Sequence, residues 1–175
     1  MTCLVRPAKV SDADAVGVLH VQTWRETYAG LMPAELLDSL SPVRRAEMWR
    51  GMLARGARGL FVGEESQAVV GFGICGPQRT KSLPNYPGEI YAINILRRAQ
   101  GRTLGSGLMR AMARDLISRR LAPATPLVLG QNIRARQFYQ RHGGRMIGEV
   151  PTNFGGIWLT EQVFAWDDLS ALAGR

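Results

Sequence analysis

The sequence predicts an α+β protein, mixed α/β in its order of elements, in which helices flank a mixed, mostly antiparallel sheet of about seven strands. The clearest strand is residues 90–96, an isoleucine-rich run that begins just after Pro87 and Gly88. The clearest helix is residues 104–116, where apolar side chains recur every three or four positions and arginines occupy the other face. These two segments, joined by a short basic turn, form the centre of the predicted fold.

Local start and stop signals delimit the elements of the N-terminal half. Ser11 is expected to cap the first long helix, and Gly30 is expected to end it. Ser41 and Pro42 begin another helix, because serine caps helices and proline is favoured in the first turn. The expected elements are strand 3–6, helices 11–28, 33–40 and 41–55, and strands 60–65 and 68–75, the last two forming a hairpin.

The C-terminal half continues the alternation after an exposed loop at residues 77–87. Asn132 is expected to cap a helix whose inward face includes Phe138 and Tyr139, and Gly143 is expected to end that helix in a left-handed conformation. The expected elements after the central helix are strand 127–129, helix 132–142, and strands 145–150 and 157–166, with residues 151–156 joining the last two.

Length and composition predict one globular domain over residues 1–175. The chain is 46% hydrophobic and 21% charged, and its apolar runs are too short for a membrane span. No signal peptide is visible, so we expect a cytoplasmic protein without a membrane partner. Cys3 and Cys75 do not form a disulfide or metal-binding pattern and are expected to be small hydrophobic residues.

The net charge of +8 comes almost wholly from arginine and indicates an anionic ligand. Residues 97–120 hold seven arginines and one acid, Asp115, so the charge is concentrated around the turn before the central helix. Helix N-termini and glycines accommodate phosphate oxygens, and Gly101, Gly105 and Gly107 lie in this region. The segment therefore predicts either a phosphate site or an ordinary turn with solvated arginines.

The chain contains the motif QGRTLG at residues 100–105 and the motif NIRARQFY at residues 132–139, which is followed by His142 and Gly143. Together these two motifs resemble the GNAT superfamily of acetyl-CoA-dependent N-acetyltransferases. The resemblance covers nearly the whole chain and implies a sheet that splays at its central strands, after residues 127–129. The chain departs from the family pattern at Thr103, where the first motif glycine belongs, and at Gly144, where an aromatic residue is frequent.

The resemblance implies acetyl-CoA as the cosubstrate and no metal. It implies that backbone groups of Ile93 and Ile95 hold the pantetheine arm, and that Asn132 either bonds this arm or only caps its helix. Because Thr103 adds bulk where the backbone approaches the ligand, we expect weakened pyrophosphate binding. The implied pyrophosphate turn consists of Gln100, Gly101, Arg102, Thr103, Gly105 and Ser106.

The resemblance also implies two proton-transfer roles. Tyr139 matches the residue that protonates the departing coenzyme A thiolate in many members, although by residue type alone it reads as a core tyrosine beside Phe138. Glu89 matches the general base of some members; the alternative is a solvated carboxylate at a strand start. His20 and His142 are weaker candidates for the base.

The expected function is direct acetyl transfer, in a ternary complex, to a primary amine of a small molecule or peptide. One alternative is a coenzyme A-binding module with weak or no catalysis, which Thr103 favours; a less favoured one is a basic nucleic-acid-binding protein, for which no motif is present. Trp24 and Tyr28 lie four residues apart and are either core residues or the lining of a pocket. Acceptor determinants are expected at residues 24–33, 77–87 and 151–156, and a homodimer through the late strands is consistent with relatives.

Overall fold

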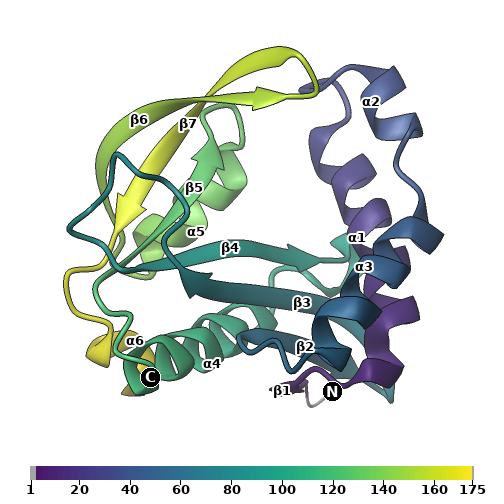
Figure 1. Cartoon of the computed structure of the whole chain (residues 1–175), viewed down its shortest axis with the longest axis horizontal. Coiled ribbons are helices and arrows are strands. Elements are labelled where there is room, and N and C mark those ends of the chain that lie inside the picture. Colours follow the sequence, from purple (N-terminus) through teal and green to yellow (C-terminus); the bar gives the residue numbers. More distant parts are fainter. Residues whose placement is uncertain (1–2, 175) are drawn as a thin grey trace. The chain divides into compact units, whose positions relative to one another are not determined.

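The computed structural model describes residues 3–174 and contains one sheet of seven strands in the order β1-β2-β3-β4-β5-β7-β6 (Figure 1). β4 pairs with β5 in parallel, whereas β1 with β2, β2 with β3, β5 with β7 and β6 with β7 are antiparallel. The mixed, mostly antiparallel sheet that the sequence predicts is therefore confirmed. None of the described helices has the length and apolarity needed to cross a membrane.

The chain divides into two compact units, Met1–Ile74 with Ala92–Met112 and Cys75–Tyr91 with Ala113–Arg175. Residues of β3 (Ala68–Pro77), β4 (Gly88–Ile95) and α4 (Leu104–Ser118) contribute to both units. The single domain over residues 1–175 stays a prediction, and residues 1, 2 and 175 lie outside the part of the chain that the structure describes.

The first unit contains most of the predicted N-terminal elements. Ser66 and Gln67 have φ values of 51° and 67°, the left-handed pair that a two-residue hairpin between β2 and β3 requires. The predicted hairpin is therefore confirmed. The elements particular to this unit are β1 (Leu4–Pro7), the 3₁₀ helix η1 (Val10–Asp12), α1 (Ala13–Tyr28), α2 (Ala34–Asp38), α3 (Pro42–Ala54), β2 (Leu60–Glu65) and the 3₁₀ helix η2 (Arg97–Ala99).

The start of α1 differs from the sequence prediction. Ser11 lies inside η1, and Asp12 stands at the start of α1 without a side-chain hydrogen bond to that helix. Its carboxylate instead accepts from the N–H of Lys9, the residue before η1, at 2.7 Å. Arg6 holds the same carboxylate at 2.8 Å. The predicted cap at Ser11 is thus wrong, because the chain forms the 3₁₀ helix η1 before α1 and Ser11 lies inside it.

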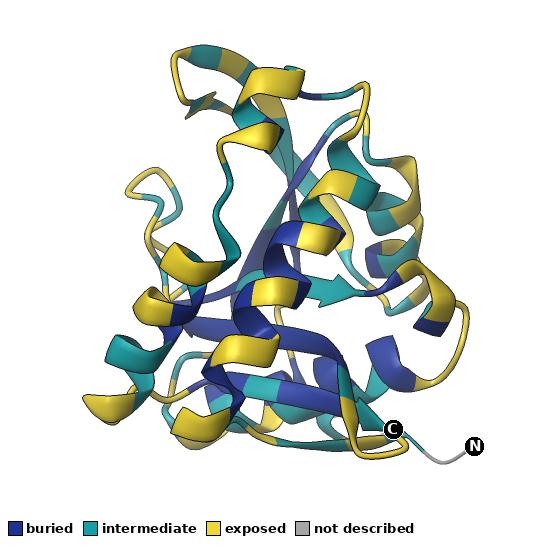
Figure 2. Cartoon of the chain, turned by 90° about the vertical axis from the view of Figure 1, so that its right-hand side faces the viewer, coloured by how far each residue is buried: buried dark blue, intermediate teal, exposed yellow. Residues whose placement is uncertain are grey.

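Close packing of α1 against α3 requires a glycine at residue 17. A Cβ there would lie 2.6 Å from the Ala46 nitrogen, which no side chain tolerates. The two helices lie side by side in Figure 1. In Figure 2, buried residues line the strands and one side of the helices, while exposed residues occupy the outer helix faces.

The second unit holds the C-terminal elements β5 (Ala124–Leu129), α5 (Ile133–Arg141), β6 (Arg145–Phe154), β7 (Ile157–Ala165) and α6 (Ser170–Gly174). The parallel register of β4 with β5 runs from Gly88 opposite Ala124 to Ile90 opposite Pro126. β4 and β5 therefore separate after Pro126, earlier than the splay predicted after residues 127–129. Pro126 has no N–H to donate to a neighbouring strand, and it occupies the last registered position. β6 extends to Phe154, so the expected connection at residues 151–156 narrows to Gly155 and Gly156.

Candidate active site

The turn after β4 is closed onto the end of that strand. The Gln100 side-chain amide donates to the Ile95 carbonyl at 2.6 Å. Gly101 has φ +76°, a backbone conformation that favours glycine. Of the described residues, none lies within 4 Å of the point where a Cβ at residue 101 would stand. The turn therefore needs this glycine for its backbone path and has open space above it.

Thr103 occupies the position immediately before α4. Its carbonyl accepts from the Gly107 N–H at 2.9 Å, as the first carbonyl of a helix does. Its side chain is exposed, and its φ is not positive; among residues 3–174, the non-glycine residues with positive φ are Ser66, Gln67 and Arg120. The backbone at residue 103 thus accommodates threonine, a favoured helix cap, without strain. The effect of this threonine on phosphate binding stays a prediction.

The glycines and serine at the start of α4 have different surroundings. Gly105 and Ser106 lie in the first turn, where helix N–H groups point outward at the positive end of the helix dipole. A Cβ at Gly107 would lie 3.0 Å from a methyl carbon of Val5 in β1. We therefore attribute Gly107 to packing against β1. Gly105 is buried and Ser106 half-buried, and their binding of pyrophosphate stays a prediction.

Two of the arginines near the turn are bound to glutamates. Arg102 forms an ion pair with Glu65 of β2. The Arg97 N–H donates to the Glu26 carboxylate of α1 at 3.0 Å, and its guanidinium donates to the Glu26 carbonyl at 3.0 Å. Arg98 is exposed. The charge of Arg102 is therefore paired with a carboxylate, whereas the Arg97 guanidinium is held by a neutral carbonyl.

The β4 residues predicted to hold the pantetheine arm, Ile93 and Ile95, are half-buried. The Ile95 carbonyl is the acceptor of the Gln100 bond, so this group is already used by the turn. Between them, the Asn94 side chain accepts from the Thr23 hydroxyl of α1 at 3.2 Å. Turn, strand and α1 are thus joined by specific polar contacts within the first unit.

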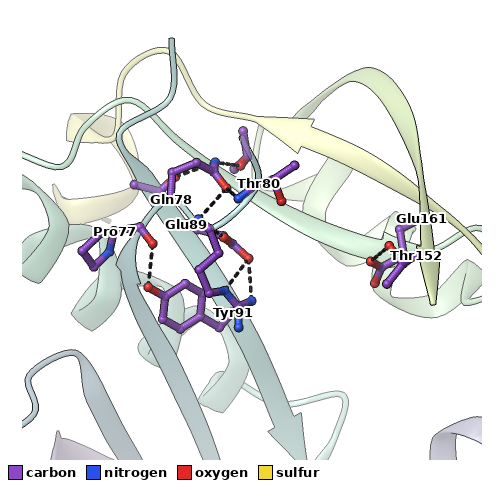
Figure 3. A network of polar contacts seen from close by, with 10 residues as sticks. Pro77, Gln78, Thr80, Glu89, Tyr91, Thr152 and Glu161 are labelled. Carbon is purple, nitrogen blue, oxygen red and sulfur yellow. Dashed lines mark hydrogen bonds and ion pairs between the residues drawn. The ribbon is translucent and has the colours of Figure 1, made fainter. Parts of the chain in front are cut away.

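In the second unit, Glu89 is almost fully buried, with 2% of its surface exposed. Its carboxylate accepts three hydrogen bonds from Arg79: from the backbone N–H at 2.9 Å, from Nε at 3.2 Å and from Nη2 at 2.6 Å (Figure 3). The solvated carboxylate considered from the sequence is therefore not what the structure contains. The base role stays a prediction for a carboxylate held by a guanidinium.

The contacts around Glu89 also fix the start of the loop at residues 77–87. The Gln78 amide donates to the buried Thr125 hydroxyl at 2.8 Å, and the Gln78 N–H donates to the Pro87 carbonyl at 2.9 Å. The Arg79 guanidinium lies 3.8 Å from the centre of the Tyr91 ring. Burial raises the pKa of the Tyr91 hydroxyl, which donates to the Pro77 carbonyl at 2.6 Å (Figure 3).

Glu161 of β7 is a second partly buried carboxylate in this unit, and sequence reasoning missed it. It accepts from the Thr152 hydroxyl of β6 at 2.6 Å (Figure 3). Burial is the main cause that raises its pKa, opposed by the Thr152 hydrogen bond; the charge of Glu89 raises the pKa further and that of Arg79 lowers it. The available signal was a single carboxylate in the otherwise apolar alternate row of residues 157–165.

Tyr139 of α5 is buried within aromatic rings. Its ring centre lies 5.6 Å from Phe138, 6.0 Å from Phe164 and 5.9 Å from Trp166. The ring therefore has the core position that residue type alone suggests, and its role as an acid stays a prediction. Asn132 caps the same helix, because its side-chain oxygen accepts from the Ala135 N–H at 3.1 Å.

Trp166 explains why residue 144 is a glycine in this chain, where the family pattern often has an aromatic residue. A Cβ at residue 144 would lie 2.8 Å from the Trp166 ring and 3.0 Å from the Tyr139 carbonyl. The indole N–H donates to the His142 carbonyl at 2.9 Å, which holds the ring in place. The tryptophan at the end of the last strand thus fills the space beside α5 that an aromatic residue at 144 would need.

The two histidines are held by local packing. His20 is 8% exposed among the rings of Trp24, Trp49 and Phe72, and burial lowers its pKa to about 4, with the charge of Arg45 as a second cause. His142 Nδ1 lies 2.8 Å from the Phe138 carbonyl. Trp24 also meets Tyr28 edge to face, with ring centres 5.1 Å apart. Within residues 3–174, no group of three or more potential ligands could hold a metal ion.

Comparisons with known proteins agree with this arrangement. A family model described as the acetyltransferase (GNAT) family matches residues 21–144. A Bacillus subtilis (strain 168) protein named uncharacterized N-acetyltransferase YuaI is 32% identical over 169 residues, covering 96% of this chain and 95% of the relative.

Two solved structures have the same fold. PaiA N-acetyltransferase of Thermoplasma acidophilum, in complex with coenzyme A, has a TM-score of 0.71 at 16% identity and covers 92% of this chain and 98% of its own. YncA of Salmonella typhimurium, solved with its cofactor acetyl-CoA, has a TM-score of 0.69 at 18% identity, with coverages of 95% and 94%. At these identities the likeness shows a common fold.

Proposed function

Because the chain belongs to the acetyltransferase (GNAT) family, we propose that it transfers the acetyl group of acetyl-CoA directly to a primary amine of a small molecule or peptide in a ternary complex. The observation that carries this proposal is the turn at residues 100–106, which joins β4 to the N-terminus of α4 inside the family match. Support for the cosubstrate comes from two structures of this fold that contain coenzyme A or acetyl-CoA.

Two features of the turn support a pyrophosphate site. Gly101 supplies a positive φ beside open space, and the first turn of α4 presents N–H groups at the positive end of the helix. Thr103 and Arg102 lie exposed in the same turn. We assign the pyrophosphate to Gln100, Gly101, Arg102, Thr103, Gly105 and Ser106, and the pantetheine arm to Ile93, Ile95 and Asn132.

Acetyl transfer requires a neutral amine, stabilisation of the oxyanion at the acetyl carbonyl and protonation of the leaving thiolate. We assign the last role to the Tyr139 hydroxyl, whose ring is held by Phe164 and Trp166. A rigidly placed phenol suits this role because proton transfer needs hydrogen-bond reach to one atom. We assign Glu89 a positioning role, because its carboxylate holds the backbone N–H and the guanidinium of Arg79 in the loop at residues 77–87.

The test combines turnover and binding on the purified chain. Release of free coenzyme A thiol from acetyl-CoA over a panel of small amines and peptides, with acetylated product identified by mass spectrometry, is expected for at least one amine. Coenzyme A binding by calorimetry without product from any amine would support a binding module instead. A chain that neither binds coenzyme A nor acetylates would contradict both readings.

A matched pair of glycine variants tests the turn. Gly101 and Gly56 have φ of +76° and +75°, and no described residue lies within 4 Å of a Cβ placed at either. Both Gly→Ala changes therefore cost similar backbone strain, on the order of 1 kcal/mol. Gly101→Ala is expected to weaken coenzyme A binding, whereas Gly56→Ala is expected only to lower stability. Equal coenzyme A affinities in the two variants would exclude the turn as the pyrophosphate site.

A further inference from the structure

We propose that Glu161 binds the ammonium group of the acceptor and removes its proton. This inference rests on the proposed acetyltransferase function and names the residue that activates the acceptor. It also implies that the acceptor enters as a cation. Three observations support it: the face of β7 on which Glu161 lies, its place beside the end of β5, and its hydrogen-bonding state compared with that of Glu89.

Glu161 lies in a row of β7 that is otherwise apolar. Side chains alternate along a strand, so residues two apart share a face. Glu161 therefore points to the same side of the sheet as the buried Val163 and Ala165. Burying a carboxylate in such a row costs free energy unless the group is paired with a charge or hydrogen-bonded. Carboxylates in such positions are therefore candidates for a functional role. The other residues of this row are Ile157, Leu159, Val163 and Ala165.

The opposite row of β7 faces α5. The centre of the Phe164 ring lies 6.0 Å from the centre of the Tyr139 ring in α5. The ring centre of Trp166, two residues further on, lies 5.9 Å from it. Since Glu161 belongs to the alternate row, its carboxylate and the helix that carries Tyr139 lie on opposite faces of this part of the sheet.

Glu161 and Tyr139 are nevertheless both close in structure to the C-terminal end of β5: Glu161 pairs with it, and Tyr139 lies on the helix that follows it. Glu161 is registered opposite Leu129, the last residue of β5. The Asn132 N–H donates to the Leu129 carbonyl at 2.8 Å, and α5 begins at Ile133. The strand end that pairs with Glu161 therefore leads directly into the helix of Tyr139, which places the two functions within one structural unit.

The hydrogen-bonding states of the two carboxylates differ. Glu89 accepts three hydrogen bonds from Arg79, two of them from its guanidinium. Glu161 has, within residues 3–174, one hydrogen bond from the neutral Thr152 hydroxyl and no ion pair. It thus retains oxygen lone pairs for an ammonium donor. Figure 3 shows the Thr152 and Glu161 pair on the hairpin of β6 and β7, apart from the group around Glu89.

The surroundings of Glu161 favour proton acceptance. Burial raises its pKa above the ordinary value and the Thr152 hydrogen bond lowers it; the facing charges are those of Glu89, which raises the pKa further, and Arg79, which lowers it. A carboxylate with a raised pKa is a stronger base. An incoming ammonium also relieves the repulsion between the two carboxylates.

The proton balance of the reaction is complete with these groups. Glu161 takes one proton from the acceptor ammonium, and the freed lone pair on nitrogen forms the bond to the acetyl carbon. The carbon–sulfur bond breaks with its electron pair on sulfur, and the Tyr139 hydroxyl gives this sulfur a proton. The surplus proton on the amide nitrogen restores the Tyr139 hydroxyl, and Glu161 returns its proton to water.

The decisive variant is Glu161→Gln. Glutamine keeps the shape of the side chain and an acceptor for the Thr152 hydroxyl, but it cannot take a proton. We expect kcat/KM to fall by roughly 100-fold near neutral pH. The deficit should shrink as pH rises, because the amine then arrives already neutral. Glu161→Asp is expected to recover part of the activity.

Glu149→Gln is the matched control. Glu149 lies on β6 of the same hairpin, is exposed, and accepts from Gln162, whose side chain belongs to the row opposite Glu161. Its pH–rate profile should coincide with that of the unchanged protein. Thermal melts of all variants separate loss of folding from loss of chemistry.

The outcomes distinguish this inference from the proposed function. An active wild-type protein whose Glu161→Gln variant shows an unchanged profile, or a deficit equal at every pH, overturns the role of Glu161 and leaves the acetyltransferase function intact. A wild-type protein that acetylates no amine overturns the function and this inference with it. A deficit that decreases with rising pH, absent in Glu149→Gln, supports the inference.

Discussion

The Arg79 guanidinium lies between the buried carboxylate of Glu89 and the ring of Tyr91, at 2.6 Å from the first and 3.8 Å from the centre of the second. The Glu89 side chain is 3% exposed, whereas that of Arg79 is 61% exposed. The buried Glu89 carboxylate is thus held by an arginine that remains in contact with solvent. Substitutions of Arg79 and of Glu89 are therefore expected to lower the free energy of unfolding by different amounts.

Arg79→Met should lower the free energy of unfolding by roughly 2 kcal/mol, because it leaves a buried carboxylate without its guanidinium. Glu89→Gln should cost less, since the partner that loses its contact is largely exposed. Urea unfolding of both variants checks this order. Because we assign Glu89 to positioning, the acid limb of the pH–rate profile should stay in place in Glu89→Gln; a displaced limb would restore Glu89 as the base.

Tyr139→Phe should lower kcat by about 10- to 100-fold while changing coenzyme A affinity little. The substitution removes only the hydroxyl and keeps the ring between Phe164 and Trp166. Steady-state kinetics and calorimetry measure the two effects separately. An unaltered kcat would show that Tyr139 is a core residue and not the acid.

Thr103→Gly should tighten coenzyme A binding, because it removes side-chain bulk beside the turn while the backbone keeps an unstrained path. The cost in stability should be a few tenths of a kcal/mol, since glycine is a tolerated helix cap. Thr103→Ser is the control that keeps the hydroxyl. If calorimetry finds no gain for glycine over serine and threonine, the threonine is not an impediment.

Gly144→Ala should destabilise the chain by about 1–3 kcal/mol, because the new methyl group would meet the Trp166 ring at 2.8 Å. Gly148→Ala, where no described residue lies within 4 Å of the Cβ position, is the matched control in β6, the strand that begins just after Gly144. Thermal unfolding of the two variants measures the difference. Equal melting temperatures would mean that the Trp166 ring moves aside without lowering the stability of the chain.

His20 should make stability depend on pH between about 6.5 and 4. Its pKa in the folded chain is lowered to about 4 from 6.5, so the unfolded chain binds the proton more tightly. This contribution is fully present above pH 6.5, decreases as pH falls to about 4, and amounts to about 3 kcal/mol. His20→Phe should lose this dependence relative to wild type, whereas His142→Gln should keep it.

The sequence by itself determined the order of the elements and the motif turn. The i+4 apolar row of α4, the hairpin at Ser66 and Gln67, and the Asn132 cap depend on neighbours close in the chain, and all three are present as predicted. The family resemblance came from the same local pattern. Periodicity and capping are local properties, so a single chain displays them.

Tertiary structure decided which of the candidate groups are already bonded. The pairing of Arg102 with Glu65 and the closure of Glu89 by Arg79 join residues that no local pattern connects. Ser11 lies inside a 3₁₀ helix instead of capping α1, and Arg6 holds the neighbouring Asp12. Glu161 emerged as a candidate only when β7 had a register and a covered face. Hydrogen-bond capacity and burial depend on packing between distant segments, and these two quantities separate an available carboxylate from an occupied one.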